Sequence, residues 1–200
     1  MKSCAVFLAD GFEEIEAVTV IDYLRRAQVM VPIIAAGGAD TVVTGAHGLS
    51  VHVDLPLARY LAELNGALPD AAYIPGGMPG AANLAADTAL CTFLTTCFAA
   101  GKIVAALCAA PAVVLSQTGI LRGRRYTCYP GMERAGDSSS ASAADAMQGS
   151  ISVPDVPFVT DGNVVTGRGP GCAEQFAMEL VRLLSGEDIM QRIKAESIQR

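Results

Sequence analysis

The sequence contains few of the residues from which metal sites are usually built. Its 200 residues include no tryptophan and only two histidines, His47 and His52, and no two of its six cysteines have the C-x-x-C spacing. Zinc sites in proteins usually combine such cysteine pairs with histidines at short spacing. We therefore expect no metal in this protein.

Basic residues are also scarce. The net charge at pH 7 is −6. The one group of neighbouring basic residues, Arg122, Arg124 and Arg125, is typical of a solvated turn. A nucleic-acid partner is therefore not expected.

Long apolar runs are absent as well. No stretch approaches the roughly 20 apolar residues that a membrane-spanning helix needs. The first apolar run, within MKSCAVFLADGFEE, is too short for a signal peptide and is followed at once by acids. We expect a cytoplasmic protein with no membrane partner, in which the cysteines are thiols.

What is present suits a folded domain, with 52% hydrophobic and 17% charged residues. Apolar runs alternate with amphipathic segments, which predicts a doubly wound, mostly parallel sheet with an antiparallel edge. Strands are predicted at 3–9, 29–36, 71–74, 103–107, 126–129, 158–160 and 164–166, and a hairpin at 41–44 and 49–53. Helices are predicted at 12–26, 57–65, 87–100, 109–115, 172–184 and 187–200, and a polar surface loop that could serve as a lid at 136–150.

The segment GKIVAALCAAPAVVL, residues 101–115, contains the first candidate functional residue. An apolar run meets a helix-compatible run there with no polar loop between them, and Cys108 stands at the join. Such an elbow exposes its side chain above the carboxyl edge of the sheet, and a nearby helix N-terminus favours a thiolate. Cys108 is therefore a candidate nucleophile or redox centre. A small buried hydrophobe is the equally open alternative.

Glu16 interrupts the apolar stripe of the helix predicted at 12–26, whereas Glu13 and Glu14 are expected to face water. On the apolar side, desolvation would raise the pKa of Glu16 and keep a proton on it near neutrality. A protonated carboxyl can donate a hydrogen bond to a thiolate. A solvated flank residue or a helix-end ion pair is the competing interpretation.

Two further strand ends carry unusual residues. Gly76 and Gly77 lie in PGGMPG, whose free amides could bind an anion, although a tight connection would explain the glycines equally well. Arg168 lies in GRGPG, where Pro170 breaks the spacing of a dinucleotide motif. Carboxyl ends of parallel strands share one edge, so these residues, Cys108 and Glu16 are expected to form one site.

Five segments carry a resemblance to a known family. They are LADGFEEIEAV near the start, IPGG at 74–77, AALCAAPAVVL, TCYPGME, and TGRGPGCAEQFAMELV. In this order they resemble the ThiJ/PfpI superfamily nearly end to end, and within it the branch of the Parkinsonism-associated protein deglycase and the bacterial YajL-type proteins. The resemblance implies a single flavodoxin-like domain over 1–200, of the class I glutamine amidotransferase-like type, and a homodimer.

The resemblance also implies a site and an activity. Cys108 would be the reactive cysteine, Glu16 a protonated carboxyl bonded to its thiolate, and the amides of Gly77 and Ala109 an anion hole. The implied activity is cofactor-free, glutathione-independent conversion of a small dicarbonyl, methylglyoxal or glyoxal, to the hydroxy acid. Deglycation of proteins, chaperoning and peroxide sensing are further roles attributed to the family.

Several positions depart from the family pattern. Ala109 stands where protease-like relatives have a histidine, which disfavours a Cys-His protease or amidase. Tyr129 replaces a histidine of the human-type protein, and His47 replaces an arginine supplied by the dimer partner, so Arg168 is expected to be the anion contact. Gly76, Tyr129 and His47 are expected pocket residues, and the 136–150 loop is longer than usual.

Three classes of function therefore stay open. The leading interpretation is an enzyme acting on reactive dicarbonyls through Cys108 and Glu16. The second is a redox sensor or chaperone in which Cys108 is oxidised without turnover, because both need the same activated thiol. The third is a scaffold with a vestigial site.

Overall fold

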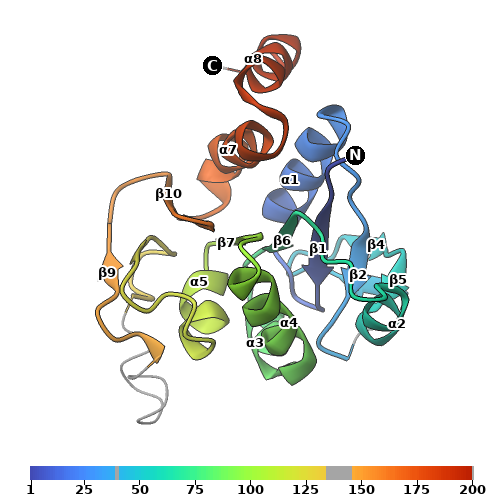
Figure 1. The fold of residues 1–200 in the computed structure, drawn as a ribbon, viewed down its shortest axis with the longest axis vertical. Helices are drawn as coiled ribbons and strands as arrows, with labels where there is room; N and C mark the ends of the chain where they lie inside the picture. Colours follow the sequence, from blue (N-terminus) through green and yellow to red (C-terminus); the bar gives the residue numbers. More distant parts are fainter. Residues whose placement is uncertain (39–40, 134–145, 200) are drawn as a thin grey trace.

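The computed structural model describes residues 1–38, 41–133 and 146–199, and a seven-stranded sheet lies at its centre (Figure 1). The strand order is β10, β11, β7, β6, β1, β2, β5. β10 runs antiparallel to β11, and all other neighbours are parallel, as predicted. The bounds are β1 Cys4–Leu8, β2 Ile33–Ala35, β5 Leu55–Pro56, β6 Ala71–Ile74, β7 Ile103–Leu107, β10 Phe158–Asp161 and β11 Val164–Gly167.

Helices cover both faces of this sheet (Figure 1). On one face α1 packs against α7, and α7 against α8, while α3, α4 and α5 lie on the other face. The bounds are α1 Glu14–Arg26, α2 Leu57–Glu63, α3 Gly80–Ala86, α4 Thr88–Ala99, α5 Ala110–Val113, α7 Ala173–Ser185 and α8 Glu187–Glu196, with 3-10 turns η1 Leu115–Gln117 and η2 Pro170–Cys172. This is the flavodoxin-like α/β sandwich that the sequence predicted.

Aromatic side chains fill the core on both faces of the sheet. Phe7 of β1 packs with Tyr60 of α2 and Phe93 of α4, with ring centroids 5.5 to 6.0 Å apart. On the opposite face, Tyr73 of β6 packs against Phe176 of α7 at 5.7 Å. All five residues of β1 are buried. A continuous apolar run is what a strand covered on both faces requires, because its side chains alternate between the faces.

A hairpin outside the main sheet lies over the carboxyl end of β1. Its strands, β3 Val42–Thr44 and β4 Ser50–His52, pair antiparallel as predicted. The Gly11 amide donates to the carbonyl of Thr44 at 2.8 Å, and the Thr44 amide donates to the Asp10 side chain at 2.8 Å. These bonds hold the hairpin beside the start of α1.

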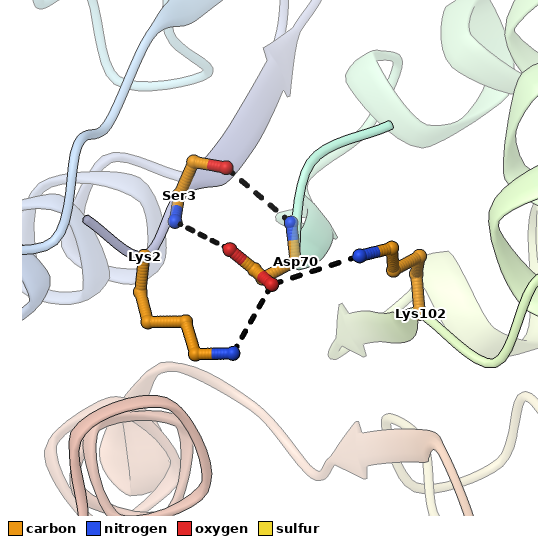
Figure 2. A network of polar contacts seen from close by, with 4 residues as sticks. All are labelled: Lys2, Ser3, Asp70 and Lys102. Carbon is orange, nitrogen blue, oxygen red and sulfur yellow. Dashed lines mark hydrogen bonds and ion pairs between the residues drawn. The ribbon is translucent and has the colours of Figure 1, made fainter. Parts of the chain in front are cut away.

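At the opposite edge, one carboxylate joins the starts of three neighbouring strands. Figure 2 shows Asp70 between Lys2 and Lys102, with N–O distances of 3.2 and 3.6 Å. The Ser3 amide also donates to Asp70 at 3.1 Å, and the Asp70 amide donates to the Ser3 hydroxyl at 3.3 Å. Asp70 therefore ties together β1, β6 and β7 where each begins.

Two predicted elements are shorter than expected. The strand predicted at 29–36 is reduced to β2, because Pro32 has no N–H for a ladder and Met30 makes an isolated bridge to Ser3. The helix predicted at 109–115 divides into α5 and η1.

The strand predicted at 126–129 lies outside the main sheet. It is reduced to β8, Arg125–Tyr126, which pairs with β9, Ile151–Ser152, in a separate two-stranded sheet. Beyond Tyr126, the backbone amides do not bond to a neighbouring strand: the Thr127 amide donates to the Thr166 hydroxyl, and the Tyr129 amide donates to the carbonyl of Cys108. A ladder therefore cannot continue.

Among the helices and strands of the described ranges, α3, β5 and β9 were not predicted at all. α3 has the sequence GAANLAA, whose small residues give little amphipathic contrast, and each of the two strands is two residues long. Residues 136–145 of the expected surface loop lie outside the described residues. No helix in the described ranges is both long and apolar enough to cross a membrane.

Candidate active site

Cys108 lies where β7 ends and the chain turns toward α5. Its φ is +62°, in the left-handed region that side-chain-bearing residues seldom adopt. Its amide donates to the carbonyl of Gly167 at 2.9 Å, and its carbonyl accepts from the amide of Tyr129 at 2.8 Å. The strained elbow is therefore held from two sides. The expectation of an exposed side chain was wrong, because Cys108 is only 7% exposed.

Two backbone amides face the Cys108 sulfur. The N–H groups of Gly77 and Ala109 both lower the pKa of the thiol, because donors near the sulfur stabilise the thiolate. Gly77 follows β6 and Ala109 follows the elbow itself. The structure thus brings together the two amides that the family resemblance implied for an anion hole.

Glu16 projects from α1 into the same site. The side chain is fully buried, and its Oε2 accepts a hydrogen bond from the amide of Gly76 at 2.7 Å. In the described part of the chain, Oε1 has no hydrogen-bond partner. The Cys108 thiol nevertheless acts on this carboxyl and lowers its pKa. A solvated flank residue and a helix-end ion pair are both excluded by this burial.

Glu16 and Cys108 influence one another's ionisation. Burial raises the pKa of Glu16 to about 7. The Gly76 amide and the Cys108 thiol both lower this pKa, but their effect is smaller than that of burial. Burial also raises the pKa of the Cys108 thiol, and the charge of Glu16 raises it further. This second effect acts only while Glu16 is ionised, so a proton on Glu16 is compatible with a charge on Cys108.

The amide of Ala109, at the start of the helix that follows the elbow, lowers the pKa of Cys108 in the expected direction, but burial decides the net shift and raises the pKa. The helix that follows the elbow, α5, has only four residues. A short helix contributes little dipole, and removal of the thiol from water outweighs the two amides.

Gly76 allows the glycine loop to approach Cys108 closely. A Cβ at Gly76 would lie 2.6 Å from the Cβ of Cys108 and 2.9 Å from the amide nitrogen of Ala109. Any larger residue would push the loop away from the sulfur. The glycines of PGGMPG therefore do more than close a tight turn.

The family model for the DJ-1/PfpI family matches residues 2–183. The chain belongs to the DJ-1/PfpI family. Among curated proteins, it is 32% identical to the Parkinson disease protein 7 homolog of Danio rerio, covering 98% of this chain and 97% of that protein. It is also 32% identical to a deglycase of Pyrococcus abyssi, covering 90% of this chain and 97% of the relative.

Solved structures of DJ-1/PfpI proteins have the same fold. A DJ-1 superfamily protein of Salmonella typhimurium is 37% identical, with a TM-score of 0.83 and coverage of 99% of this chain and 98% of that one. DJ-1beta of Drosophila melanogaster gives a TM-score of 0.85 at 29% identity, with coverage of 98% and 97%. An oxidized DJ-1 of Toxoplasma gondii gives a TM-score of 0.81 at 33% identity, with coverage of 99% of this chain and 98% of that one.

Arg168 reaches the expected edge of the sheet, but its described contacts lie away from the Cys108 sulfur. Its guanidinium pairs with the exposed Asp155 at 2.7 Å. Its charge also lowers the pKa of Cys172, although burial raises that pKa overall. The role of Arg168 as an anion contact stays a prediction of the DJ-1/PfpI resemblance.

Tyr129 lies beside the elbow, and it is 48% exposed. The amide of this residue bonds to the Cys108 carbonyl, and the ring lies close to Gly169, within 3.6 Å of where a Cβ would stand. The backbone of Tyr129 thus supports the site directly. The position of its side chain in a pocket stays a prediction of the sequence.

His47 pairs with Glu14 of the same chain. Its Nδ1 lies 2.7 Å from Oε2 of Glu14, and its amide donates to Oε1 at 2.6 Å. Glu14 and Glu13 are 8% and 7% exposed, so the expectation that they face water was wrong. The hairpin covers them, which a helical pattern by itself cannot reveal.

Glu13, Glu14 and His47 also form the one group of three potential metal ligands in the described ranges, with ligand atoms within 4.8 Å of one another. Both oxygens of Glu14 already accept hydrogen bonds from the hairpin. Glu13 bonds to the amide of Glu16. The arrangement is that of a latch between helix and hairpin, and we assign no metal to it.

Sequence reasoning missed two residues close to the site. Glu13 caps α1 through the Glu16 amide, and its i, i+3 spacing to Glu16 resembles a capping box. Cys172 ends η2, and the charges of Arg168 and Glu16 both act on its thiol. No pattern in the sequence marks Cys172, because its neighbours come from distant segments.

Proposed function

We propose that this protein is a cysteine-dependent, cofactor-free glyoxalase or deglycase that acts on small dicarbonyls such as methylglyoxal or glyoxal. The observation that supports this most directly is the Cys108 sulfur between the amides of Gly77 and Ala109, beside the buried carboxyl of Glu16. A nucleophile, an acid/base group and oxyanion donors are the parts that aldehyde chemistry requires.

The reaction would proceed in three steps. The Cys108 thiolate adds to the aldehyde carbon, and the oxygen takes a proton, which gives a hemithioacetal. Glu16 then moves a proton between the two oxidised carbons through an enediol, which leaves a thioester of the hydroxy acid. Water hydrolyses the thioester and restores the thiol, so methylglyoxal plus water becomes lactate with no external oxidant or reductant.

The comparisons support this proposal at the level of the family. The relative from Pyrococcus abyssi is named a deglycase. Small dicarbonyls form inside cells, which fits the cytoplasmic location expected from the sequence.

A redox sensor or chaperone that uses the same thiol is the second candidate. The observation that favours it is the solved DJ-1 of Toxoplasma gondii, which is described as oxidized. In this chain, peroxide would convert Cys108 to the sulfenic and then the sulfinic acid. The sensor interpretation predicts oxidation without turnover.

We also propose that the protein is a homodimer. Ile15 and Val18 on α1 and Leu49 beside the hairpin are 57%, 46% and 51% exposed. Exposed apolar side chains on neighbouring elements favour a protein partner. Size-exclusion chromatography with light scattering should give a mass near twice that of the chain, and Val18→Lys should shift it to the monomer. A monomeric wild-type protein at micromolar concentration would contradict this.

The decisive test is lactate formation from methylglyoxal by the reduced protein without glutathione. We expect turnover that Cys108→Ser abolishes and that Cys91→Ser, which changes a half-buried thiol on α4, leaves intact. Glu16→Ala should also abolish turnover. No lactate from protein whose Cys108 is shown by mass spectrometry to be reduced would exclude the enzyme and leave the sensor.

A further inference from the structure

Glu13, Gly76 and Glu16 are linked in a closed ring of hydrogen bonds. The Glu13 amide donates to the carbonyl of Gly76 at 3.0 Å, and the Gly76 amide donates to Oε2 of Glu16 at 2.7 Å. The Glu16 amide donates in turn to Oε2 of Glu13 at 2.7 Å. The ring fixes the start of α1 to the glycine loop that faces Cys108.

The Glu13 carboxylate carries its charge close to Glu16 with little screening. The residue is 7% exposed. Within the described ranges it forms no ion pair with a lysine or arginine. The imidazole of His47 is exposed and bonded to Glu14, and it lies within 4.8 Å of a Glu13 carboxylate oxygen, so it is the one basic group of the described residues that faces this charge. A buried carboxylate of this kind repels a second negative charge next to it.

The other ionisable groups near Glu16 come from several parts of the fold. They are Cys108 at the elbow, Tyr73 of β6 and Cys172 of η2. On the far side of Glu13 lie His47 of the hairpin and the Glu14 carboxylate of α1 to which it is bonded. Tyr73 donates its hydroxyl to the Glu16 carbonyl at 3.2 Å. Among these groups, Glu13 is the carboxylate that acts directly on the Glu16 side chain.

We propose that Glu13 is a positioning residue of the thiol site, which orients Glu16 through the helix cap and, by its charge, keeps the shared proton on Glu16 and the negative charge on Cys108. With one proton between the pair, the charge can rest on either group. Glu13 lies beside Glu16, so its repulsion disfavours the state with Glu16 ionised. This role rests on the proposed function of the thiol, and it concerns ionisation rather than turnover.

The test separates the charge of Glu13 from its capping bond. Glu13→Gln keeps an oxygen that can accept from the Glu16 amide and removes the charge. We expect it to slow alkylation of Cys108 by iodoacetamide about three- to tenfold between pH 6 and 8, since one pKa unit corresponds to a tenfold change. Peptide mapping by mass spectrometry reports Cys108 separately from the other five cysteines.

The same change in a Glu16→Gln background is the control that decides between charge and structure. Glutamine at position 16 cannot ionise, so Glu13→Gln should then leave the rate and pH profile of Cys108 unchanged. An equal loss of the Cys108 alkylation rate in both backgrounds would show that Glu13 acts only as a helix cap, and would overturn the proposal. An unchanged alkylation rate in the wild-type background would overturn it as well.

Two further variants keep the result interpretable. If Glu13→Gln fails to fold, Glu13→Asn removes the same charge, and asparagine is a residue favoured at helix starts. Glu187→Gln changes the first residue of α8 and should leave alkylation unaffected. Because alkylation does not require turnover, absence of lactate formation would count against the proposed enzyme and not against this role of Glu13.

Discussion

At the scale of single residues, the site depends on close approaches that only small groups allow. Gly76 lies against the Cys108 side chain, and Gly77 presents its amide to the sulfur at a φ of +90°. Cys108 itself occupies a left-handed conformation. Strain of this kind persists where the surrounding structure enforces it, and here backbone bonds to Gly167 and Tyr129 do so.

We expect Gly76→Ala to disrupt this site. The added methyl group must displace Cys108 or the Ala109 amide, which should cost about 1–3 kcal/mol in the free energy of unfolding and slow alkylation of Cys108. Urea denaturation and iodoacetamide kinetics would measure the two effects. Gly171→Ala, where a Cβ meets open space, should change stability by less than about 0.5 kcal/mol. Equal effects of the two substitutions would contradict this account.

At the scale of elements, the hairpin and α1 are joined by the Glu14 carboxylate. It accepts from the amides of His47 and Leu49 and pairs with the His47 ring. The hairpin is not part of the main sheet. It therefore relies on this latch and on the bonds at Asp10 and Gly11 to stay beside the site.

We expect Glu14→Ala to loosen the hairpin and leave the rest of the fold intact. The His47 and Leu49 amides would lose their buried acceptor, at a cost of about 1–3 kcal/mol. Hydrogen–deuterium exchange should rise at residues 42–52 and stay unchanged in β6 and β7. Glu63→Ala, which removes an exposed carboxylate on α2, is the control. Unchanged exchange in the hairpin would mean that the latch is unnecessary.

At the scale of the whole molecule, three neighbouring strands begin at one carboxylate and end at one site. Asp70 joins the starts of β1, β6 and β7 (Figure 2). The other ends of these strands lead to Glu16, Gly76 and Cys108. The alignment of the strands thus contributes to the geometry at the far edge.

The Asp70 network makes stability depend on pH. Bonds to Lys2 and Ser3 and the charge of Lys102 lower the pKa of Asp70, although burial opposes them. A carboxyl with a lowered pKa in the folded state contributes stability above its unfolded pKa, and that stability is lost as the pH falls through the folded value.

We expect Asp70→Asn to destabilise the protein by about 1 kcal/mol at pH 7, and the difference from wild type to vanish below the folded pKa of Asp70. Urea denaturation at several pH values would measure it, with the exposed Asp188→Asn as control. A difference that stays constant down to acid pH would show that charge is not the cause.

The sequence was sufficient for the main strands of the architecture and for singling out Glu16 and Cys108 as candidate residues. Parallel strands covered on both faces need continuous apolar runs, so CAVFL and IVAAL marked β1 and β7. Glu16 was noticeable because it interrupts an apolar stripe, and Cys108 because no polar loop separates strand from helix. These signals are local and periodic, and residues near in sequence determine them.

Tertiary structure alone decided the surroundings of these residues. The burial of Glu13 and Glu14, the ring through Gly76 and the raised pKa of Cys108 all arise where the hairpin, the glycine loop and α1 meet. The bonds that create that environment join residues far apart in sequence, Glu14 to His47 across 33 positions and Glu16 to Gly76 across 60. Desolvation and hydrogen-bond partners depend on which segments pack together, so no pattern within one segment could have revealed them.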